Sequence, residues 1–267
     1  MPVANARMYS ATPPAKQAWK DVLGWALECA GLNWEVIEFD APAPLSELWG
    51  RADLGCAMMC GLPYSQRRPR PALVAAPVPS PARYGGRPVY FTDIVVRADA
   101  RYRTLEDTFG GVVGYTLRDS MSGCVALRAH LLRYRRTQGA PLYRAAIGGL
   151  LNARRVIEAL DAGEIDVGPL DSYYHDLLRK SDPDSVARIR VIESTDAAPI
   201  PPLVATAPLA LQDLKRLRTA LLAAGQAREL ASQRDTLLLA GFVVPSESHY
   251  DAMSGILAAS RQFPDTW

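Results

Sequence analysis

A short polar turn near the middle of the chain holds residue types suited to binding an anion. An apolar segment, Gly111–Tyr115, precedes the turn Asp119–Gly123, and a helix is predicted to start directly after it. The first N–H groups of a helix lack acceptors within the helix, and its dipole makes this end electropositive. Ser120 and Ser122 are small enough to let an oxyanion approach, and Gly123 keeps the backbone accessible. Serine is also an ordinary helix cap, and on spacing alone the pattern favours a turn that binds nothing.

Two further groups of side chains lie where ligands are often bound. Asp171 and Ser172 follow a predicted short strand, and open α/β sheets bind ligands beyond the carboxyl ends of their strands. Asp171 could accept hydrogen bonds from a ligand, or it could cap the helix predicted from Tyr173. The second group lies at predicted strand ends or turns, where a hydroxyl can bond and a ring can stack. Its members are Tyr9, Tyr64, Tyr90 and Thr92, and such tyrosines are more often half-buried packing.

Strands and helices alternate through the middle of the chain, and this order predicts an α/β fold with parallel sheets. The predicted strands are Ala6–Ser10, Trp34–Phe39, Ala52–Cys60, Leu73–Val78, Val89–Arg97, Gly111–Tyr115, Ile165–Leu170, Ile189–Ile192 and the extended run Ile200–Ala205. The predicted helices run from Thr12 to Ala30, over Leu45–Gly50, from Cys124 to Tyr134, over Asn152–Leu160 and over Tyr173–Arg179. Gly61–Tyr64 is predicted to be a turn and residues 77–88 a surface loop, because Gly and Pro interrupt regular structure.

The last third of the chain is predicted to be mostly helical. Leu209–Gly241 should form two helical segments that break near Gly225, and Ser246–Ser260 should form a final helix. These residues contain too few strands for a sheet of their own. We therefore expect them to pack back onto the part of the molecule formed by the first residues.

Composition and charge exclude several classes of protein. The 267 residues are enough for two lobes, each with its own core. The formal net charge of +2 argues against nucleic-acid binding, and we interpret the arginines clustered within residues 67–70 and 128–136 as solvated surface. No apolar stretch is long enough to cross a bilayer, so we expect no membrane insertion.

Cysteine and histidine spacing gives no sign of a metal or cofactor site. The four cysteines (Cys29, Cys56, Cys60 and Cys124) match no zinc or redox motif, and the three histidines lie far apart in sequence. We expect the cysteines to be buried hydrophobic residues in a reducing compartment. The first residues do not resemble a signal peptide, so the sequence as it stands predicts a cytoplasmic location, or a periplasmic one if a leader has been removed.

Several short segments, taken in order, resemble the phosphate/phosphite/phosphonate solute-binding proteins of ABC importers. They fall between Met8 and Val244, and each is common alone, whereas the ordered set is fairly specific. The segments are Ala52–Gly55, Cys60–Tyr64, Pro88–Arg97, Thr104–Asp107, Asp119–Gly123, Gly163–Ser172 and Ile200–Pro202.

The resemblance implies an α/β, two-lobed, type II periplasmic-binding fold. Each lobe would hold a mixed, mostly parallel sheet flanked by helices. Two hinge strands, near Tyr90–Arg97 and Val191–Val204, would join the lobes. Residues 1–92 would begin lobe 1, residues 93–197 would form lobe 2, and residues 198–267 would return to lobe 1 and add the C-terminal helices. The ligand would be captured between the lobes by hinge closure.

The resemblance also implies a function and a set of site residues. The chain would be a solute-binding protein, and not an enzyme, for a small phosphonate-like, phosphate-like or carboxylate anion, with an ABC permease as its transport partner. Donors for the anionic head would come from Ser120, Met121, Ser122, Gly123 and Cys124. The remaining site residues would line the opposite wall or face the rest of the ligand, and these are Tyr9, Tyr64, Tyr90, Thr92, Asp171 and Ser172.

Two positions depart from the family pattern. Met121 stands where typical members have Thr, and residues 146–150 read Ala-Ile-Gly-Gly-Leu where typical members have a Ser-Gly-Ser-His turn. Both differences remove polar groups from the site. They favour a carboxylate or a partly apolar ligand over phosphonate itself.

An enzymatic alternative remains open on sequence grounds. Some cytoplasmic enzymes of menaquinone biosynthesis use the same bilobal fold and act on carboxylated small molecules. Such an enzyme needs an acid or base in its cleft, for which Asp119, Asp171 and His175 are the candidates. We interpret His175 as a surface residue, and the sequence contains no evident Ser-His-Asp or Cys-His arrangement.

Overall fold

The computed structural model describes residues 1–40, 43–138, 141–262 and 267. The chain divides into two compact units: unit 1 contains residues 1–89 and 199–250, and unit 2 contains residues 90–198 and 251–267. The two links fall within a pair of short bonded strands, β5 (Val89–Tyr90) and β11 (Ala198–Pro199). These links lie close to the expected boundaries, whereas residues 251–267 belong to unit 2 and do not return to the first.

Unit 1 is built on a six-stranded sheet with the order β13-β4-β12-β3-β1-β2. Strand β1 pairs in parallel with β2 and β3, whereas β12 pairs antiparallel with β3 and β4, and β13 antiparallel with β4. The sheet is mixed, as predicted, but the expectation of mostly parallel pairing was wrong, since two of these strand pairs are parallel and three are antiparallel. Its strands are β1 (Val3–Asn5), β2 (Glu35–Val36), β3 (Leu54–Met58), β4 (Ala72–Pro79), β12 (Leu203–Ala205) and β13 (Leu239–Val243).

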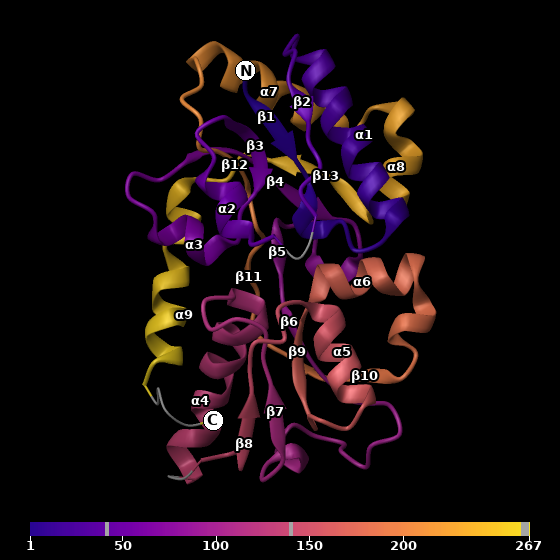
Figure 1. Cartoon of the computed structure of the whole chain (residues 1–267), viewed down its shortest axis with the longest axis vertical. Helices are drawn as coiled ribbons and strands as arrows, with labels where there is room; N and C mark the ends of the chain where they lie inside the picture. The colour runs from indigo at the N-terminus through magenta and orange to yellow at the C-terminus, as the bar shows by residue number, and fades with distance from the viewer. Residues whose placement is uncertain (41–42, 139–140, 263–266) are drawn as a thin grey trace. The chain divides into compact units, whose positions relative to one another are not determined.

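The helices of unit 1 cover this sheet with apolar faces. Helix α1 starts where predicted, because Thr12 accepts a hydrogen bond from the Ala15 N–H and prolines occupy its first turn. On its buried face, Trp19 packs edge-to-face against Phe242 of β13, with ring centroids 6.2 Å apart. Figure 1 shows α1 and α8 side by side on one flank. The helices are α1 (Pro13–Cys29), α2 (Leu45–Gly50), α3 (Gly61–Gln66), α7 (Leu211–Ala224) and α8 (Ala231–Thr236).

Three predictions for unit 1 were wrong in detail. The segment Ala6–Ser10 is not a strand, since β1 precedes it and Arg7–Tyr9 forms a 3₁₀ turn. The predicted turn Gly61–Tyr64 is the start of α3, because Pro63 lies in the first turn, where a helix needs no N–H. The predicted second helical segment before Gly241 contains β13, because a short apolar run fits a buried strand and a buried helix equally well.

Unit 2 contains one three-stranded and one two-stranded sheet. Strand β6 pairs antiparallel with both β10 and β9, and β7 pairs in parallel with β8. An isolated parallel bridge between Val113 and Val167 connects β7 to the segment before β9. Figure 1 shows β6 and β9 adjacent within this unit. The strands are β6 (Thr92–Arg97), β7 (Val112–Gly114), β8 (Ala145–Ile147), β9 (Gly168–Asp171) and β10 (Ile189–Ser194).

Helices of unit 2 pack on these sheets and on each other. Helix α4 lies against α9 (Figure 1), so the last helix belongs to this core. The helices are α4 (Ala126–Gln138), α5 (Ala153–Asp161), α6 (Ser172–Ser181) and α9 (Ala252–Ser260). Short 3₁₀ turns complete the two units at Ala82–Tyr84, Glu106–Thr108, Pro183–Val186, Arg228–Leu230 and Glu247–Tyr250.

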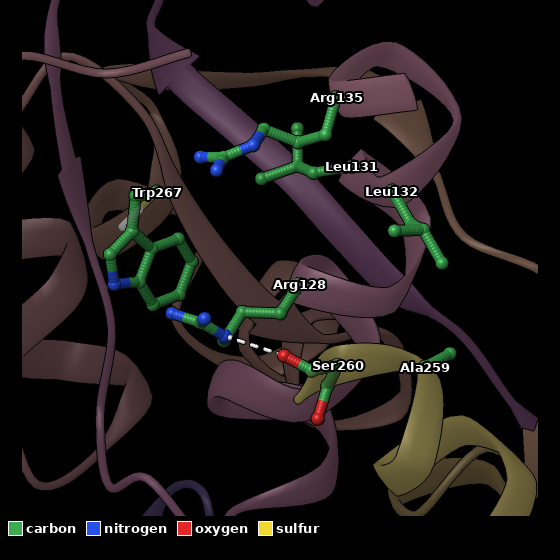
Figure 2. A pocket seen from close by; sticks show the side chains of 7 residues that line it. All are labelled: Arg128, Leu131, Leu132, Arg135, Ala259, Ser260 and Trp267. Carbon is green, nitrogen blue, oxygen red and sulfur yellow. Dashed lines mark hydrogen bonds between the residues drawn. The ribbon is translucent and has the colours of Figure 1, made fainter. Parts of the chain in front are cut away.

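Trp267 fixes the far end of the unit 2 core. Its ring stacks on Tyr115 with a centroid distance of 5.0 Å, and its carbonyl accepts hydrogen bonds from the N–H groups of Leu142 and Tyr143. Figure 2 shows the small pocket beside this ring, where Arg128 lies over Trp267 and donates to the Ser260 carbonyl at 3.1 Å. This pocket is part of the α4–α9 packing.

Among the described residues, no helix has the length and apolarity needed to span a membrane. The same residues contain no cluster of three or more His, Cys, Asp or Glu side chains placed to hold a metal ion.

Candidate anion-binding site

The polar turn singled out from the sequence is the start of a helix in unit 2. Residues Met121–Val125 form a π-helical turn that α4 continues, and Ser120 is its N-cap in an extended conformation. The Ser120 Oγ accepts a hydrogen bond from the Gly123 N–H at 3.1 Å. The first backbone hydrogen bonds of this turn are accepted by the carbonyls of Ser120 and Met121. In each bond the donor N–H belongs to the residue five positions later in the chain.

This turn keeps several hydrogen-bond donors available. In the part of the chain that the structure describes, the backbone N–H groups of Met121 and Ser122 have no acceptor. The hydroxyl protons of Ser120 and Ser122 likewise have none there, and both side chains are partly exposed. A helix start with this many open donors is an electropositive site that favours an oxyanion.

Gly123 serves a different purpose from the one predicted. A Cβ at this position would lie 1.8 Å from the Thr116 Oγ1, and the Thr116 N–H donates to the Gly123 carbonyl at 2.9 Å. The glycine is buried and lets the turn pack closely on the strand extension before it. Its role here is to hold the turn in place, and not to expose the backbone to a ligand.

Met121 and Cys124 point into the core and not into solvent. The Met121 side chain is fully buried, and Cys124 belongs to the hydrophobic cluster around Leu127 and Val113. Burial raises the pKa of the Cys124 thiol to about 11, an effect that the charges of Arg128 and Arg118 only partly offset. The thiol is therefore neutral at physiological pH, and these two residues can contact a ligand only through their backbone.

Thr92 supports the turn from the neighbouring sheet. Its Oγ1 donates to the Ser122 carbonyl at 3.1 Å, and its N–H donates to the Thr195 Oγ1 at 3.1 Å. With its hydroxyl proton used in this way, Thr92 orients the helix start and has no proton left for a ligand in this arrangement. Asp171 is its register partner in the β6–β9 pair, so the structure brings these predicted residues together.

Asp171 and Ser172 have structural partners of their own. The Asp171 Oδ1 accepts hydrogen bonds from the N–H groups of Tyr173 and Tyr174 at 3.0 and 3.1 Å, which makes it the N-cap of α6. Ser172 is fully buried, and its Oγ accepts from the Phe91 N–H at 2.9 Å. The capping alternative weighed from the sequence is thus confirmed for Asp171.

The three tyrosines predicted to line a wall are buried. Tyr9, Tyr64 and Tyr90 are each at most 1% exposed, and Tyr9 and Tyr64 belong to unit 1. The Tyr64 ring packs edge-to-face on Tyr250 at 5.0 Å between centroids. Tyr90 lies in a strand as predicted, whereas Tyr9 and Tyr64 lie in helical turns that were not predicted, and the burial of all three was not predicted either.

A buried polar network next to Thr92 was missed. Asp93 is fully buried on β6, where its Oδ2 lies 3.0 Å from the His175 Nδ1 and its Oδ1 accepts from the Ser194 hydroxyl at 2.7 Å. The interpretation of His175 as a surface residue was wrong, because only 2% of its side chain is exposed. An aspartate within the β-branched run Thr92–Val96 was the available signal, since a buried carboxylate requires partners.

A known protein family matches most of the chain. A family model described as the periplasmic substrate-binding protein of phosphonate ABC transporters matches residues 49–250. None of the curated proteins matches the sequence.

Solved structures share the fold at low sequence identity. A binding-protein component of an ABC phosphonate transporter from Pseudomonas aeruginosa has a TM-score of 0.78 and 17% identity, over 97% of this chain and 87% of that one. PhnD1 from Prochlorococcus marinus in complex with methylphosphonate has a TM-score of 0.73 and 13% identity, over 95% and 96%. A Xanthomonas citri protein bound to chloride has a TM-score of 0.68 and 17% identity, over 97% of both chains.

These likenesses confirm the predicted fold class, the two-lobed α/β architecture of type II periplasmic-binding proteins. The match of the family model over most of the chain confirms the resemblance that the ordered segments indicated. The chain therefore belongs to the family of periplasmic substrate-binding proteins of phosphonate ABC transporters.

Proposed function

We propose that this chain binds a small oxyanion, a phosphonate, a phosphate or a carboxylate, at the helix start Ser120–Ser122. The open N–H groups and hydroxyls of that turn carry the proposal, because they offer several donors at the positive end of a helix dipole. The family supplies the role: its members are solute-binding proteins that work with ABC permeases. A relative of the same fold was solved with methylphosphonate, which supports an oxyanion of this size as the ligand.

A catalytic role finds less support than a binding role. Among the acid–base candidates, Asp171 caps a helix and His175 is buried against Asp93, while Asp119 is exposed. Asp171 and His175 are thus already engaged in hydrogen bonds within the fold. The family consists of solute-binding proteins and not of enzymes, which supports the same conclusion.

A titration tests this function directly. Isothermal calorimetry with phosphate, methylphosphonate, sulfate and acetate should give saturable binding for at least one of these anions. A bound anion should also raise the melting temperature, since it stabilises the native state by about 2.7 kcal/mol at one hundred times its Kd. If none of these anions binds or shifts the melting temperature, the proposal fails.

The variant Ser122→Ala localises the binding. Removing a hydroxyl that donates to a charged ligand should cost about 1–3 kcal/mol of binding free energy, which is about a 5- to 150-fold rise in Kd. Ser254→Ala, which changes an exposed serine on α9 of the same unit, is the matched control and should leave Kd unchanged. Equal affinity of both variants would remove the helix start from the site.

Two related expectations belong to this proposal. Hinge closure of the two lobes on the ligand would reduce the radius of gyration, which small-angle scattering measures with and without anion. The family is described as periplasmic, so we expect this chain in the periplasm, and the cytoplasm is the alternative. Cell fractionation with an antibody to the chain distinguishes the two compartments.

A further inference from the structure

An exposed apolar cluster borders the proposed oxyanion site in unit 2. Leu117, Ile147 and Leu151 are 44%, 37% and 62% exposed. Within the described part of unit 2 these are all of the large hydrophobic side chains that are exposed, and the others lie in unit 1. Single exposed hydrophobic residues are ordinary, whereas several gathered at one place indicate a binding surface.

Backbone hydrogen bonds hold the segments of this apolar cluster together. Strands β7 and β8 are parallel, and beyond their carboxyl ends the chain segments continue side by side. The Tyr115 N–H donates to the Ile147 carbonyl at 2.9 Å, and the Gly149 N–H donates to the Thr116 carbonyl at 2.8 Å. Leu117 and Leu151 directly extend these two segments. The carboxyl end of parallel strands is the usual place for ligands in α/β proteins.

The apolar cluster is continuous with the helix start. The Ser120 N–H donates to the Leu117 carbonyl at 3.0 Å, so Leu117 and the anion-binding donors belong to one tight turn. Arg118 lies between them, with its guanidinium 5.7 Å from the centre of the Tyr115 ring. This surface therefore combines a positive charge, open N–H groups and apolar side chains, which complements an anion with an apolar body.

The β8 side of the cluster offers no polar side chain. Residues 145–151 read Ala-Ala-Ile-Gly-Gly-Leu-Leu. A Cβ at Gly148 would lie 2.1 Å from the Tyr115 ring, so this position requires glycine. Residues 145–151 themselves therefore offer a hydrophilic substituent no side-chain hydrogen-bond partner, whereas an apolar substituent would leave water on contact with them.

We infer that the ligand of this site carries an apolar substituent of several carbons next to its oxyanion, and that Leu117, Ile147 and Leu151 contact that substituent. This inference rests on the proposed function, because the oxyanion at Ser120–Ser122 brings the substituent to the cluster. The ligand class is an alkyl- or aryl-substituted phosphonate or carboxylate, and the leucine and isoleucine side chains determine specificity.

A homologous series of probes tests the inference. Calorimetric titration with methyl-, ethyl-, propyl- and butylphosphonate should show affinity rising about fourfold with each methylene group that leaves water. 2-Aminoethylphosphonate has the length of propylphosphonate but ends in an ammonium group, and it should bind at least tenfold more weakly. Inorganic phosphate provides the reference for the oxyanion alone.

The double variant Leu117→Ser/Leu151→Asn should flatten this series, with each affinity expressed relative to the same variant's affinity for phosphate. Leu151 has a φ of 63°, a conformation that Asn adopts more readily than Leu, so the variant should fold. Leu211→Ser and Leu222→Ser, which change exposed leucines on α7 of unit 1, are matched controls and should preserve the fourfold steps.

The outcomes separate the two proposals. Equal affinity for all alkylphosphonates, with Ser122→Ala weakening every one, would overturn the apolar specificity and leave the oxyanion site intact. A flat series together with self-association that the double variant abolishes, seen by sedimentation velocity, would overturn it in favour of a protein contact. Failure of phosphate and of every phosphonate to bind would overturn the proposed function, and this inference with it.

Discussion

Helices α4 and α6 of unit 2 both begin after a strand with polar residues, yet their first turns differ. At α6, the Asp171 carboxylate accepts two backbone hydrogen bonds and places a negative charge on the positive end of the helix. At the turn before α4, a neutral hydroxyl, the Oγ of Ser120, accepts a single backbone hydrogen bond. A carboxylate thus accepts the first backbone hydrogen bonds at α6, whereas only a neutral hydroxyl has that role at the turn before α4.

The acceptors present in the first turn distinguish a helix cap from a binding site better than the residue types do. An Asp-Ser pair follows a predicted strand at both positions in sequence, and either pattern could bind a ligand. What distinguishes them is whether the first N–H groups already have acceptors and whether the local charge is already balanced. The wider π-helical turn of Met121–Val125 adds to the contrast, because π-type turns are often found at functional sites.

The largest change in anion affinity is expected when the helix start at Ser120–Ser122, whose first N–H groups have no acceptor among the described residues, is given a carboxylate. Ser122→Asp places a negative charge among the donors, so it should repel an anionic ligand and raise Kd more than 100-fold. The thermal stability should stay the same or rise, because an acidic residue in the first turn stabilises a helix by about 0.3–1 kcal/mol. Calorimetric titration and a melting curve of the same sample measure both quantities.

Ser122→Asn is the matched control, since it is nearly isosteric with Asp but neutral. It should keep anion affinity within tenfold of the original protein. Retention of full affinity by Ser122→Asp would contradict the assignment of the anion to this turn.

A smaller effect, on stability and not on anion affinity, is expected from removing the Asp171 carboxylate that caps α6. Asp171→Ala leaves the Tyr173 and Tyr174 N–H groups without their acceptor, so it should cost about 1 kcal/mol of unfolding free energy. Anion affinity should not change, because the carboxylate serves the helix. Urea unfolding and titration test the two statements separately.

Asn152→Ala provides a comparable change at α5, where the Asn152 Oδ1 accepts from the Arg155 N–H at 3.1 Å. Both variants should lose similar stability. If Asp171→Ala also lowered anion affinity, the sequence-based assignment of Asp171 to the ligand would be restored.

Secondary structure was predictable where local signals are strong. The cap of α1 at Thr12 and that of α5 at Asn152 mark helices whose apolar residues follow a helical period, and both helices formed as predicted. Strand β4 formed close to the predicted range. Strands β8 and β13 were missed, because short apolar segments lack a period that distinguishes strand from helix.

Site residues were predictable by position but not by environment. Ser120 and Ser122 lie at a helix start as predicted, since a strand followed by a hydroxyl-rich turn favours that structure locally. Burial depends on distant parts of the chain, so the sequence could not show that Tyr64 packs on Tyr250. The same holds for His175, whose partner Asp93 lies 82 positions away in sequence.

The smallest effect is expected at Cys124, which follows the open donors in sequence but turns its side chain into the core. Burial raises the pKa of this thiol from an ordinary value of 9.0 to about 11, and that of Cys56 to about 12. Native protein at pH 8 should therefore be alkylated by iodoacetamide at the exposed Cys29 first, with Cys56 and Cys124 protected.

The direction of the pH effect follows from the same shift. Because the folded thiol of Cys124 keeps its proton above the pH at which the unfolded thiol loses it, its contribution to stability is full below pH 9. That contribution falls as the pH rises toward about 11, and Cys124→Ala should remove it from a urea-unfolding series over this range. The same variant should leave anion affinity within twofold, because the thiol does not face the donors. Protection of Cys124 from alkylation by bound anion, or a clear loss of affinity in the variant, would show that the side chain contributes to the site after all.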